Sequence, residues 1–387
     1  MRFSVIAAAL VAVVVGFGGT LAIVVAAARS LGADGAEVGS WVGALCLAIG
    51  VSSLVLSVLS RKPVVTAWSL AGGVLIAAMP PGFTMPEAVG AFVLYAVLTI
   101  LSGAIPALGQ AVARLPASVG AAMLAGLLLR FVVSLFQAAQ AEPLLVLPLL
   151  LVFLLARRVH AASAPLVVIV AGLPLAALLG HSLPVPVFGL AAPVWVTPVF
   201  HPGALLGLGV PLFMITMATQ QIPGAAVLRA AGYEPPLRMA LITTGIVSLL
   251  TAPFGGYATN LSSVTAALCT GPDAHPDPAR RWLTGPIYGG CYLVLALLGA
   301  GFAAMLAGLP PLLVTTVAGT ALVGPMTNAL TVGLANERER FAAVTAFGVT
   351  VSGMAFLGLG GAFWGLVAGV AVLAMERVHF RRRVVGA

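Results

Sequence analysis

The chain has 387 residues, of which 61% are hydrophobic and 7% are charged, and its formal net charge is +8. A water-soluble protein of this length needs about a quarter of its residues charged to cover its surface, so the composition excludes a soluble enzyme. It indicates a polytopic membrane protein, because each crossing of the ~30 Å hydrocarbon layer uses about 20 apolar residues.

The polar residues that could carry other functions are too dispersed to do so. Basic residues are scattered between apolar runs, apart from the run Arg381–Arg383 near the C-terminal end, which favours a topology signal over a nucleic-acid-binding surface. Cys46, Cys269 and Cys291 lack metal-ligand spacing, so the sequence predicts no metal site and no cofactor. No nucleophile and base are expected at one depth, which argues against a membrane-embedded enzyme.

Apolar runs separated by charged or Pro/Gly-rich breaks predict fourteen membrane spans. They lie at 5–28, 38–59, 64–79, 88–105, 117–139, 143–156, 164–179, 207–228, 238–254, 257–270, 284–306, 311–330, 341–358 and 361–376. With a cytoplasmic N-terminus, sixteen of the eighteen basic residues fall on the inner side, as the positive-inside rule requires, so both termini are predicted to be cytoplasmic. Thirteen spans or a re-entrant segment stay open, because the run at 143–156 is short.

A proline-rich segment, 180–206, divides the predicted spans into seven and seven. An odd number of spans per half makes the second half enter the membrane in the opposite sense, as an inverted repeat requires. The third and tenth spans start 193 residues apart, at 64 and 257, and the fifth and twelfth start 194 apart, at 117 and 311. These offsets predict an all-α polytopic membrane protein with 14 transmembrane segments arranged as a 7+7 inverted repeat.

The third and tenth spans are short and interrupted by glycine and proline, within 62–73 and 253–263. Residues that favour extended backbone precede Ser69 and Asn260, which are good N-caps, so each segment is predicted as a short strand followed by a helix start. Two such helix starts would aim free N–H groups at one point, which suits a carboxylate. The alternative is that the glycines only allow close helix packing. The flanking residues predicted to contact substrate are Leu70, Ala71, Leu261 and Ser262.

Spans 1 and 8 add polar and aromatic candidates. Span 8 places a hydroxyl and an amide on one helical face, and span 1 has a glycine-rich patch with one aromatic ring. The polar groups need partners inside a membrane, so they mark either a binding site or hydrogen bonds between helices. The aromatic rings mark either apolar walls of a site or ordinary packing. The candidates are Phe17, Thr20, Phe213, Thr216, Gln220 and Gln221, joined by Tyr257 at the start of span 10.

Three stretches, at 216–233, 251–261 and 267–281, resemble the bacterial benzoate:proton symporter family, and the resemblance covers nearly the whole chain. The last stretch, Ala-Leu-Cys-Thr-Gly-Pro-Asp-Ala-His-Pro-Asp-Pro-Ala-Arg-Arg, is the most specific. The resemblance implies an inner-membrane protein with the fold shared by nucleobase permeases and sulfate-type anion transporters. It also implies a site between spans 1, 3, 8 and 10. The implied core domain comprises 1–112 and 206–308, and the implied gate domain comprises 113–205 and 309–387.

Proton coupling is where the chain departs from the related nucleobase permeases, which carry an acidic residue in span 8. All ten acidic residues of this chain lie at or near predicted span ends. His275, flanked by Asp273 and Asp277, is a candidate for proton exchange, although this stretch also reads as a capped turn. Alternatively, the substrate carboxylate carries the proton itself. Arg130, inside span 5, is expected to pair structurally or to reach the membrane surface.

We therefore expect a secondary transporter that imports benzoate or a similar aromatic carboxylate by proton symport and alternating access. Its partners would be the substrate, protons, the lipid bilayer and, by analogy with related folds, a second copy in a homodimer. The alternative is the same fold used for a nucleobase or an inorganic anion, as an uncoupled uniporter or a channel.

Overall fold

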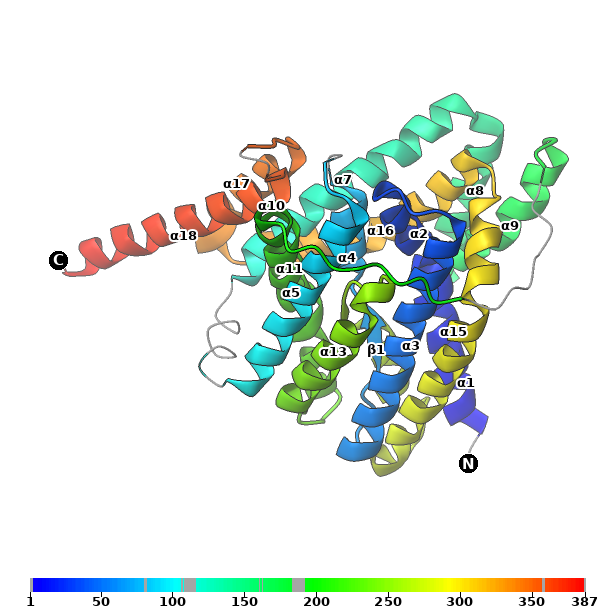
Figure 1. The fold of residues 1–387 in the computed structure, drawn as a ribbon, viewed down its shortest axis with the longest axis horizontal. Coiled ribbons are helices and arrows are strands. Elements are labelled where there is room, and N and C mark those ends of the chain that lie inside the picture. The colour runs from blue at the N-terminus through cyan, green and yellow to red at the C-terminus, as the bar shows by residue number, and fades with distance from the viewer. Residues whose placement is uncertain are drawn as a thin grey trace.

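A computed structural model describes residues 3–79, 82–105, 107, 116–159, 161, 163–182, 192–356 and 359–385, and nearly all of its elements are helices (Figure 1). The first half contains α1 (Phe3–Val13), the π-turn η1 (Val14–Gly18), α2 (Gly19–Ser30), α3 (Gly35–Ser60), β1 (Thr66–Trp68), α4 (Leu70–Ala77), α5 (Met85–Ala104), α7 (Ala117–Ala141), α8 (Pro143–Val159) and α9 (Ala164–Leu178).

The second half begins with a helix that is interrupted twice by π-turns. Its elements are α10 (Pro202–Ala204), η2 (Leu205–Gly209), α11 (Val210–Thr216), η3 (Met217–Gln221), α12 (Ile222–Ala230), α13 (Leu237–Thr251), η4 (Ala252–Phe254), β2 (Thr259–Leu261), α14 (Val264–Thr270), η5 (Pro278–Leu283), α15 (Thr284–Ala307), α16 (Pro311–Leu334), η6 (Glu337–Glu339), α17 (Arg340–Val351) and α18 (Gly361–Val385). The C-terminal part of α18 extends away from the other helices (Figure 1).

Eight helices of the described residues are long and apolar enough to cross a membrane, so the chain is a multi-pass membrane protein. They are Phe3–Ser30, Gly35–Ser60, Met85–Ala104, Ala117–Ala141, Pro202–Ala230, Leu237–Phe254, Pro278–Gly299 and Pro311–Leu334. Ala164–Leu178 and Gly361–Glu376 are shorter apolar helices. The other predicted spans coincide with helices of 17 residues or fewer, so the count of fourteen stays a prediction.

The long helices pack in pairs drawn from the two halves of the chain. α3 lies against α15, α5 against α13, and α7 against α16 and α17. Small residues bring α3 and α15 together, because a Cβ on Gly289 would lie 2.7 Å from the carbonyl oxygen of Gly50, and one on Gly285 would lie 1.9 Å from Ser57 Oγ. Such close backbone approach is how membrane helices gain contact area when the surrounding lipid is as apolar as their side chains.

The segment that joins the halves is extended where it is described, from 192 to 200, and crosses the core helices in Figure 1. Val196 N donates to Pro253 O at 2.8 Å, and Val199 N donates to Pro86 O at 2.9 Å. Ser40 Oγ accepts from Val194 N at 2.9 Å. The predicted hinge is therefore fastened to helices of both halves over this stretch, while 183–191 lie outside the described residues.

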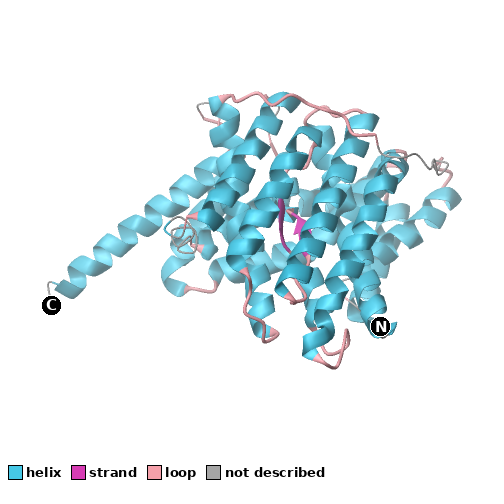
Figure 2. Cartoon of the chain, turned by 60° about the horizontal axis from the view of Figure 1, so that its bottom comes forward, coloured by secondary structure: helices cyan, strands magenta, loops and turns pink. Residues whose placement is uncertain are grey.

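The two short strands predicted in the third and tenth segments are present and form one antiparallel ladder at the centre of the helices (Figure 2). Thr66 pairs with Leu261, Ala67 with Asn260, and Trp68 with Thr259. Non-helical backbone inside a membrane needs internal hydrogen-bond partners, and here each strand is the partner of the other. Helix α4 follows β1 after one residue and α14 follows β2 after two, so two helices begin inside the protein.

Candidate functional site

The paired strands β1 and β2, called the strand crossing below, are joined at both ends by a matching pair of backbone hydrogen bonds. Ser69 N donates to Ala258 O at 3.0 Å, and Ser262 N donates to Val65 O at 3.1 Å. Ser262 lies 193 residues after Ser69, and Ala258 lies 193 residues after Val65. The same bond therefore occurs twice with the roles of the two halves exchanged.

Two buried tyrosines repeat this pattern from the flanking helices. Tyr95 of α5 donates to Thr259 O at 2.9 Å, and Tyr288 of α15 donates to Thr66 O at 3.0 Å. Both tyrosines are 0% exposed and are again 193 residues apart. They satisfy strand carbonyls that the two-stranded ladder leaves free. Neither tyrosine was among the residues predicted from the sequence, although their spacing equals the predicted repeat offset.

Ser69 caps α4 as predicted. Its Oγ accepts from Gly72 N at 2.9 Å and lies 2.8 Å from Thr216 Oγ1 of α11. The first two N–H groups of α4, those of Leu70 and Ala71, have no acceptor within the helix. Ser69, Ala71 and Thr216 are fully buried, so these donors and hydroxyls lie deep inside the protein. Four predicted site residues are thus brought together at the start of one helix.

Asn260 is not the N-cap of the tenth segment, so that prediction is corrected. It lies in the middle of β2, and α14 begins only at Val264. The hydroxyl that serves the first turn of α14 belongs to Ser262, whose Oγ accepts from Thr265 N at 3.2 Å. Strand pairing with Ala67 explains the difference, because it holds Asn260 in extended backbone. The offset from Ser69 to its counterpart is therefore 193 residues, to Ser262, and not 191.

The Asn260 side chain is buried and only half satisfied. Its Nδ2 donates to Leu261 O at 2.7 Å, whereas Oδ1 has no hydrogen-bond partner among the described residues. Buried polar atoms are nearly always paired in native proteins, so an orphan at this position marks a place for a ligand or a water molecule. Asn260 remains a candidate binding residue, through its side chain and not through a cap.

The π-turn η3 decides which glutamine faces the crossing. Hydrogen bonds in a π-turn run from i to i+5, so Gln221 lies on the same face as Thr216. Gln221 Oε1 accepts from Leu261 N at 3.1 Å, and its Nε2 donates to Thr244 Oγ1 at 3.2 Å. Gln221 thus holds β2 in place, while Gln220 is half-buried. Ordinary helical spacing from Thr216 pointed to Gln220, because the sequence does not announce the wider turn.

The aromatic residues predicted to form apolar walls divide into two groups. Phe17 of η1 lies 5.9 Å from the ring of Trp68 and 5.4 Å from that of Phe302. Trp68 Nε1 donates to Thr20 Oγ1 at 2.8 Å, which links two predicted site segments. Tyr292 of α15, missed by the sequence analysis, completes this group at 6.3 Å from Trp68.

Tyr257 belongs to the second group. Its ring lies 5.9 Å from that of Trp41 in α3 and 6.1 Å from that of Phe92 in α5. Its hydroxyl donates to Ser69 O at 3.1 Å, so Tyr257 helps to hold the residue that caps α4. Phe213 is buried in α11.

The proposed proton-coupling residues lie beyond α14. His275 is buried, and its Nδ1 lies 3.0 Å from Asp277 N and 3.1 Å from Asp277 O, so that nitrogen has a partner whether or not it is protonated. Asp273 is exposed. Arg281 donates to the carbonyl oxygens of His275 and Thr270 at 2.7 and 2.9 Å, which fixes the shape of this loop.

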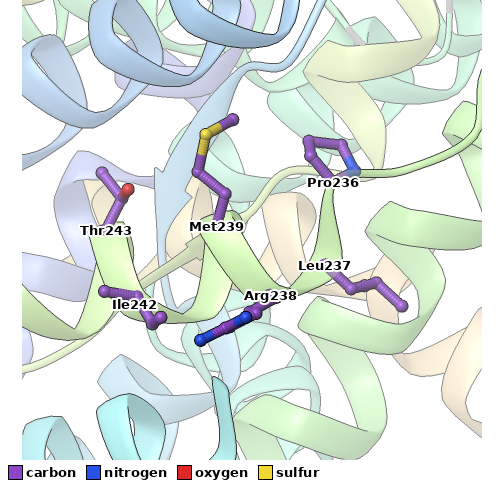
Figure 3. Close-up of a pocket in the computed structure, with 6 residues that line it drawn as sticks. All are labelled: Pro236, Leu237, Arg238, Met239, Ile242 and Thr243. Atoms are coloured by element: carbon purple, nitrogen blue, oxygen red, sulfur yellow. The ribbon is translucent and has the colours of Figure 1, made fainter. Parts of the chain in front are cut away.

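Other charged positions lie away from the crossing. Arg130 of α7 donates to Ala78 O at the C-terminal end of α4, where a positive charge complements the helix dipole. A surface groove of about 520 Å³ follows the first turns of α13 (Figure 3). None of the predicted site residues lines it; its lining is Pro236, Leu237, Arg238, Met239, Ile242 and Thr243.

Comparison with known proteins gives one family and one fold. The model of the benzoate membrane transport protein family matches residues 1–375. Inner membrane protein YdcO of Escherichia coli is 38% identical over 378 residues, 97% of this chain and 97% of that protein. The benzoate membrane transport protein of Acinetobacter baylyi is 32% identical over 364 residues, 94% of this chain and 92% of that one. The transmembrane domain of the cyanobacterial bicarbonate transporter BicA superposes with a TM-score of 0.65 at 17% identity, over 96% of this chain and 98% of that domain, which shows a shared fold.

Proposed function

The chain belongs to the benzoate membrane transport protein family, and from that premise we propose that it imports benzoate or a similar aromatic carboxylate by proton symport. The transporter lies in the bacterial inner membrane with both termini in the cytoplasm. The observation that carries the proposal is the start of α4 at Ser69, inside the protein, with the unpaired Asn260 Oδ1 in the strand beside β1.

The substrate carboxyl group lies at the N-terminus of α4, where the N–H groups of Leu70 and Ala71 and the Ser69–Thr216 hydroxyl pair offer hydrogen bonds. The aromatic ring lies toward Phe17, whose neighbours are also aromatic. α14 contributes less than the sequence suggested, because it has only seven residues and Ser262 occupies one of its first donors.

The architecture behind this site is a 7+7 inverted repeat of fourteen spans. The strands, the capping serines and the paired tyrosines all repeat at 193 residues, which supports the repeat independently of hydropathy. The π-turns η1 and η2 start at 14 and 205, an offset of 191 residues, close to but not equal to the offset of the strands.

Transport proceeds by movement of a core domain, 1–112 and 206–308, against a gate domain, 113–205 and 309–387. The strongest helix contacts, α3 with α15, α5 with α13, and α7 with α16, each lie within one of these units. The described end of the linker, 192–200, is hydrogen-bonded to core helices, so it moves with the core.

Uptake of labelled benzoate into proteoliposomes tests this function. The inward proton gradient is varied at fixed membrane potential, and passive entry is subtracted with protein-free liposomes. Saturable accumulation that follows the gradient is the expected result. Saturable equilibration that ignores the gradient would remove the symport, and protein-dependent uptake blocked by uracil or sulfate would indicate another solute. No protein-dependent uptake of benzoate would refute the proposal.

A further inference from the structure

The Oδ1 atom of Asn260, which lacks a hydrogen-bond partner among the described residues, is a hydrogen-bond acceptor. Asn260 is 0% exposed, and its Oδ1 has no partner among the described residues. Its Nδ2 donates to Leu261 O at 2.7 Å, which fixes the orientation of the amide, because exchanging the two atoms would place oxygen against oxygen. An amide oxygen accepts hydrogen bonds and donates none, so its missing partner is a donor.

This acceptor lies on the same face of the ladder as Ala67, the one residue of the two strands that is not fully buried. Residues directly opposite in an antiparallel pair present their side chains on the same face, so Asn260 and Ala67 share one. Ala67 is half-buried, whereas Thr66 and Trp68 on the other face are buried. Two residues beyond Ala67 the chain reaches Ser69, which caps α4. Ser69 N bonds to Ala258 O, two residues before Asn260, so the acceptor and the start of α4 adjoin the same strand pair.

A carboxylate anion satisfies only one side of this pair. Its two oxygens both accept hydrogen bonds, so it suits the N–H groups of α4 but would set an anionic oxygen against Asn260 Oδ1. A protonated carboxylic acid has one oxygen that accepts and one O–H that donates, which is complementary to both sides. A buried acceptor without a donor costs free energy, so the neutral acid is the better ligand at this position.

We propose, on the basis of the proposed function, that the site binds its substrate as the neutral carboxylic acid. The acid O–H donates to Asn260 Oδ1, and the carbonyl oxygen accepts from the first N–H groups of α4. The proton of the symport is therefore carried by the substrate and not by a protein side chain.

The balance of the cycle follows directly. On the outer side one carboxylate and one proton combine to form the acid, the acid crosses, and on the inner side the O–H bond ionises and releases both. One proton enters with each substrate and no net charge moves. Among the buried described residues, the only Asp, Glu, Lys, Arg or His side chains are His275 and Arg281, and both lie beyond α14 and away from the strand crossing.

Competition for labelled benzoate on the purified full-length protein tests the protonation state. Benzamide is neutral and carries both a carbonyl oxygen and N–H donors, benzenesulfonate is a permanent anion, and methyl benzoate has no donor. Benzamide is expected to compete equally well at about pH 6 and about pH 8, with benzenesulfonate and methyl benzoate at least roughly tenfold weaker. Benzoate itself should weaken by about tenfold for each pH unit above its own pKa, because its neutral fraction falls by that factor.

The opposite ranking would overturn the inference. If benzenesulfonate competes as well as benzoate and benzamide does not compete, the site holds the anion, and the proposed transport function still stands. If labelled benzoate shows no saturable binding at about pH 6, where the inference expects the stronger binding, the proposed function fails and this inference fails with it.

A pair of variants separates the amide from general damage to the ladder. Asn260→Leu removes the acceptor and should weaken benzamide and benzoate by about tenfold. Thr259→Val is the matched control, because Thr259 is the neighbouring buried residue, its Oγ1 also has no partner, and it lies on the other face of the strand. It should bind benzamide within about twofold of the unaltered protein. Equal losses in both variants, or no loss in Asn260→Leu, would contradict the role of Asn260.

Discussion

Replacing the cap of α4 is the most direct test of the candidate site. Ser69→Ala removes the bond from Gly72 N to Ser69 Oγ, at 2.9 Å, and the contact with Thr216 Oγ1, at 2.8 Å. Loss of a serine N-cap costs about 1 kcal/mol of stability, and loss of a buried hydroxyl hydrogen bond costs about 1 kcal/mol more. The variant should therefore be destabilised by about 2 kcal/mol.

Substrate binding should fall as well, because the freed first turn no longer holds its N–H groups in position. Loss of one hydrogen bond of about 1.4 kcal/mol corresponds to a tenfold weaker affinity for benzoate. The measurements are equilibrium binding of labelled benzoate and the thermal unfolding midpoint of the purified protein.

Ser263→Ala provides the control. Ser263 holds the N-cap position of α14 but its side chain makes no capping hydrogen bond. Its replacement should leave both measurements close to those of the unaltered protein, within about 0.5 kcal/mol. Unchanged binding in Ser69→Ala, or equal damage from Ser263→Ala, would refute the assignment of the substrate to the start of α4.

Three further predictions concern the supports of the crossing. Gly224→Val should overpack α12 against β2, because even a Cβ at this position would lie 2.7 Å from a β2 side chain. The expected loss of stability is about 1–3 kcal/mol, with impaired folding and transport. Normal thermal stability of the variant would contradict this. Gln221→Leu should lower the thermal unfolding midpoint because it breaks two buried hydrogen bonds, whereas Gln220→Leu should leave the midpoint unchanged. The reverse order would show that the π-turn does not turn Gln221 toward β2. Tyr95→Phe and Tyr288→Phe should destabilise the purified protein by similar amounts, about 1–2 kcal/mol each, because they remove equivalent bonds from the two halves; a large difference would argue against the repeat.

Sequence reasoning located the crossing because its signals are local. Glycine and proline in the third and tenth spans, with β-branched residues before Ser69, report directly on backbone preference. It failed at Asn260 because the end of a strand is set by its partner: Ala67 holds Asn260 in the ladder, and a sequence read one segment at a time does not show that pairing. Ser262, two residues further, then serves the first turn of α14.

Gln220 and Gln221 were both candidates, and the sequence did not show how differently they are placed. Propensity predicts that span 8 is helical, but not that its hydrogen bonds lengthen to i+5 between 217 and 221. The aromatic residues show a third limit. Phe17 and Tyr257 were both candidates for the apolar walls of one site, and they lie in separate aromatic groups: Tyr257 packs against Trp41 and donates to Ser69 O. The sequence identifies aromatic residues that could line a site, but only the tertiary structure shows which of them lie together.

The duplicated bonds also constrain how the transporter can move. β1 and β2 come from different halves of the chain, and each is fastened to a tyrosine of a neighbouring core helix, by Tyr288 and Tyr95. Opening the crossing would leave several buried backbone groups unpaired in a low-dielectric interior, which costs far more than sliding two apolar helix surfaces past each other. The ladder and the start of α4 therefore move as one body. In the proposed division into core and gate domains, the contacts that change during transport are those between this body and the proposed gate helices, and they include the bond from Arg130 to Ala78 O.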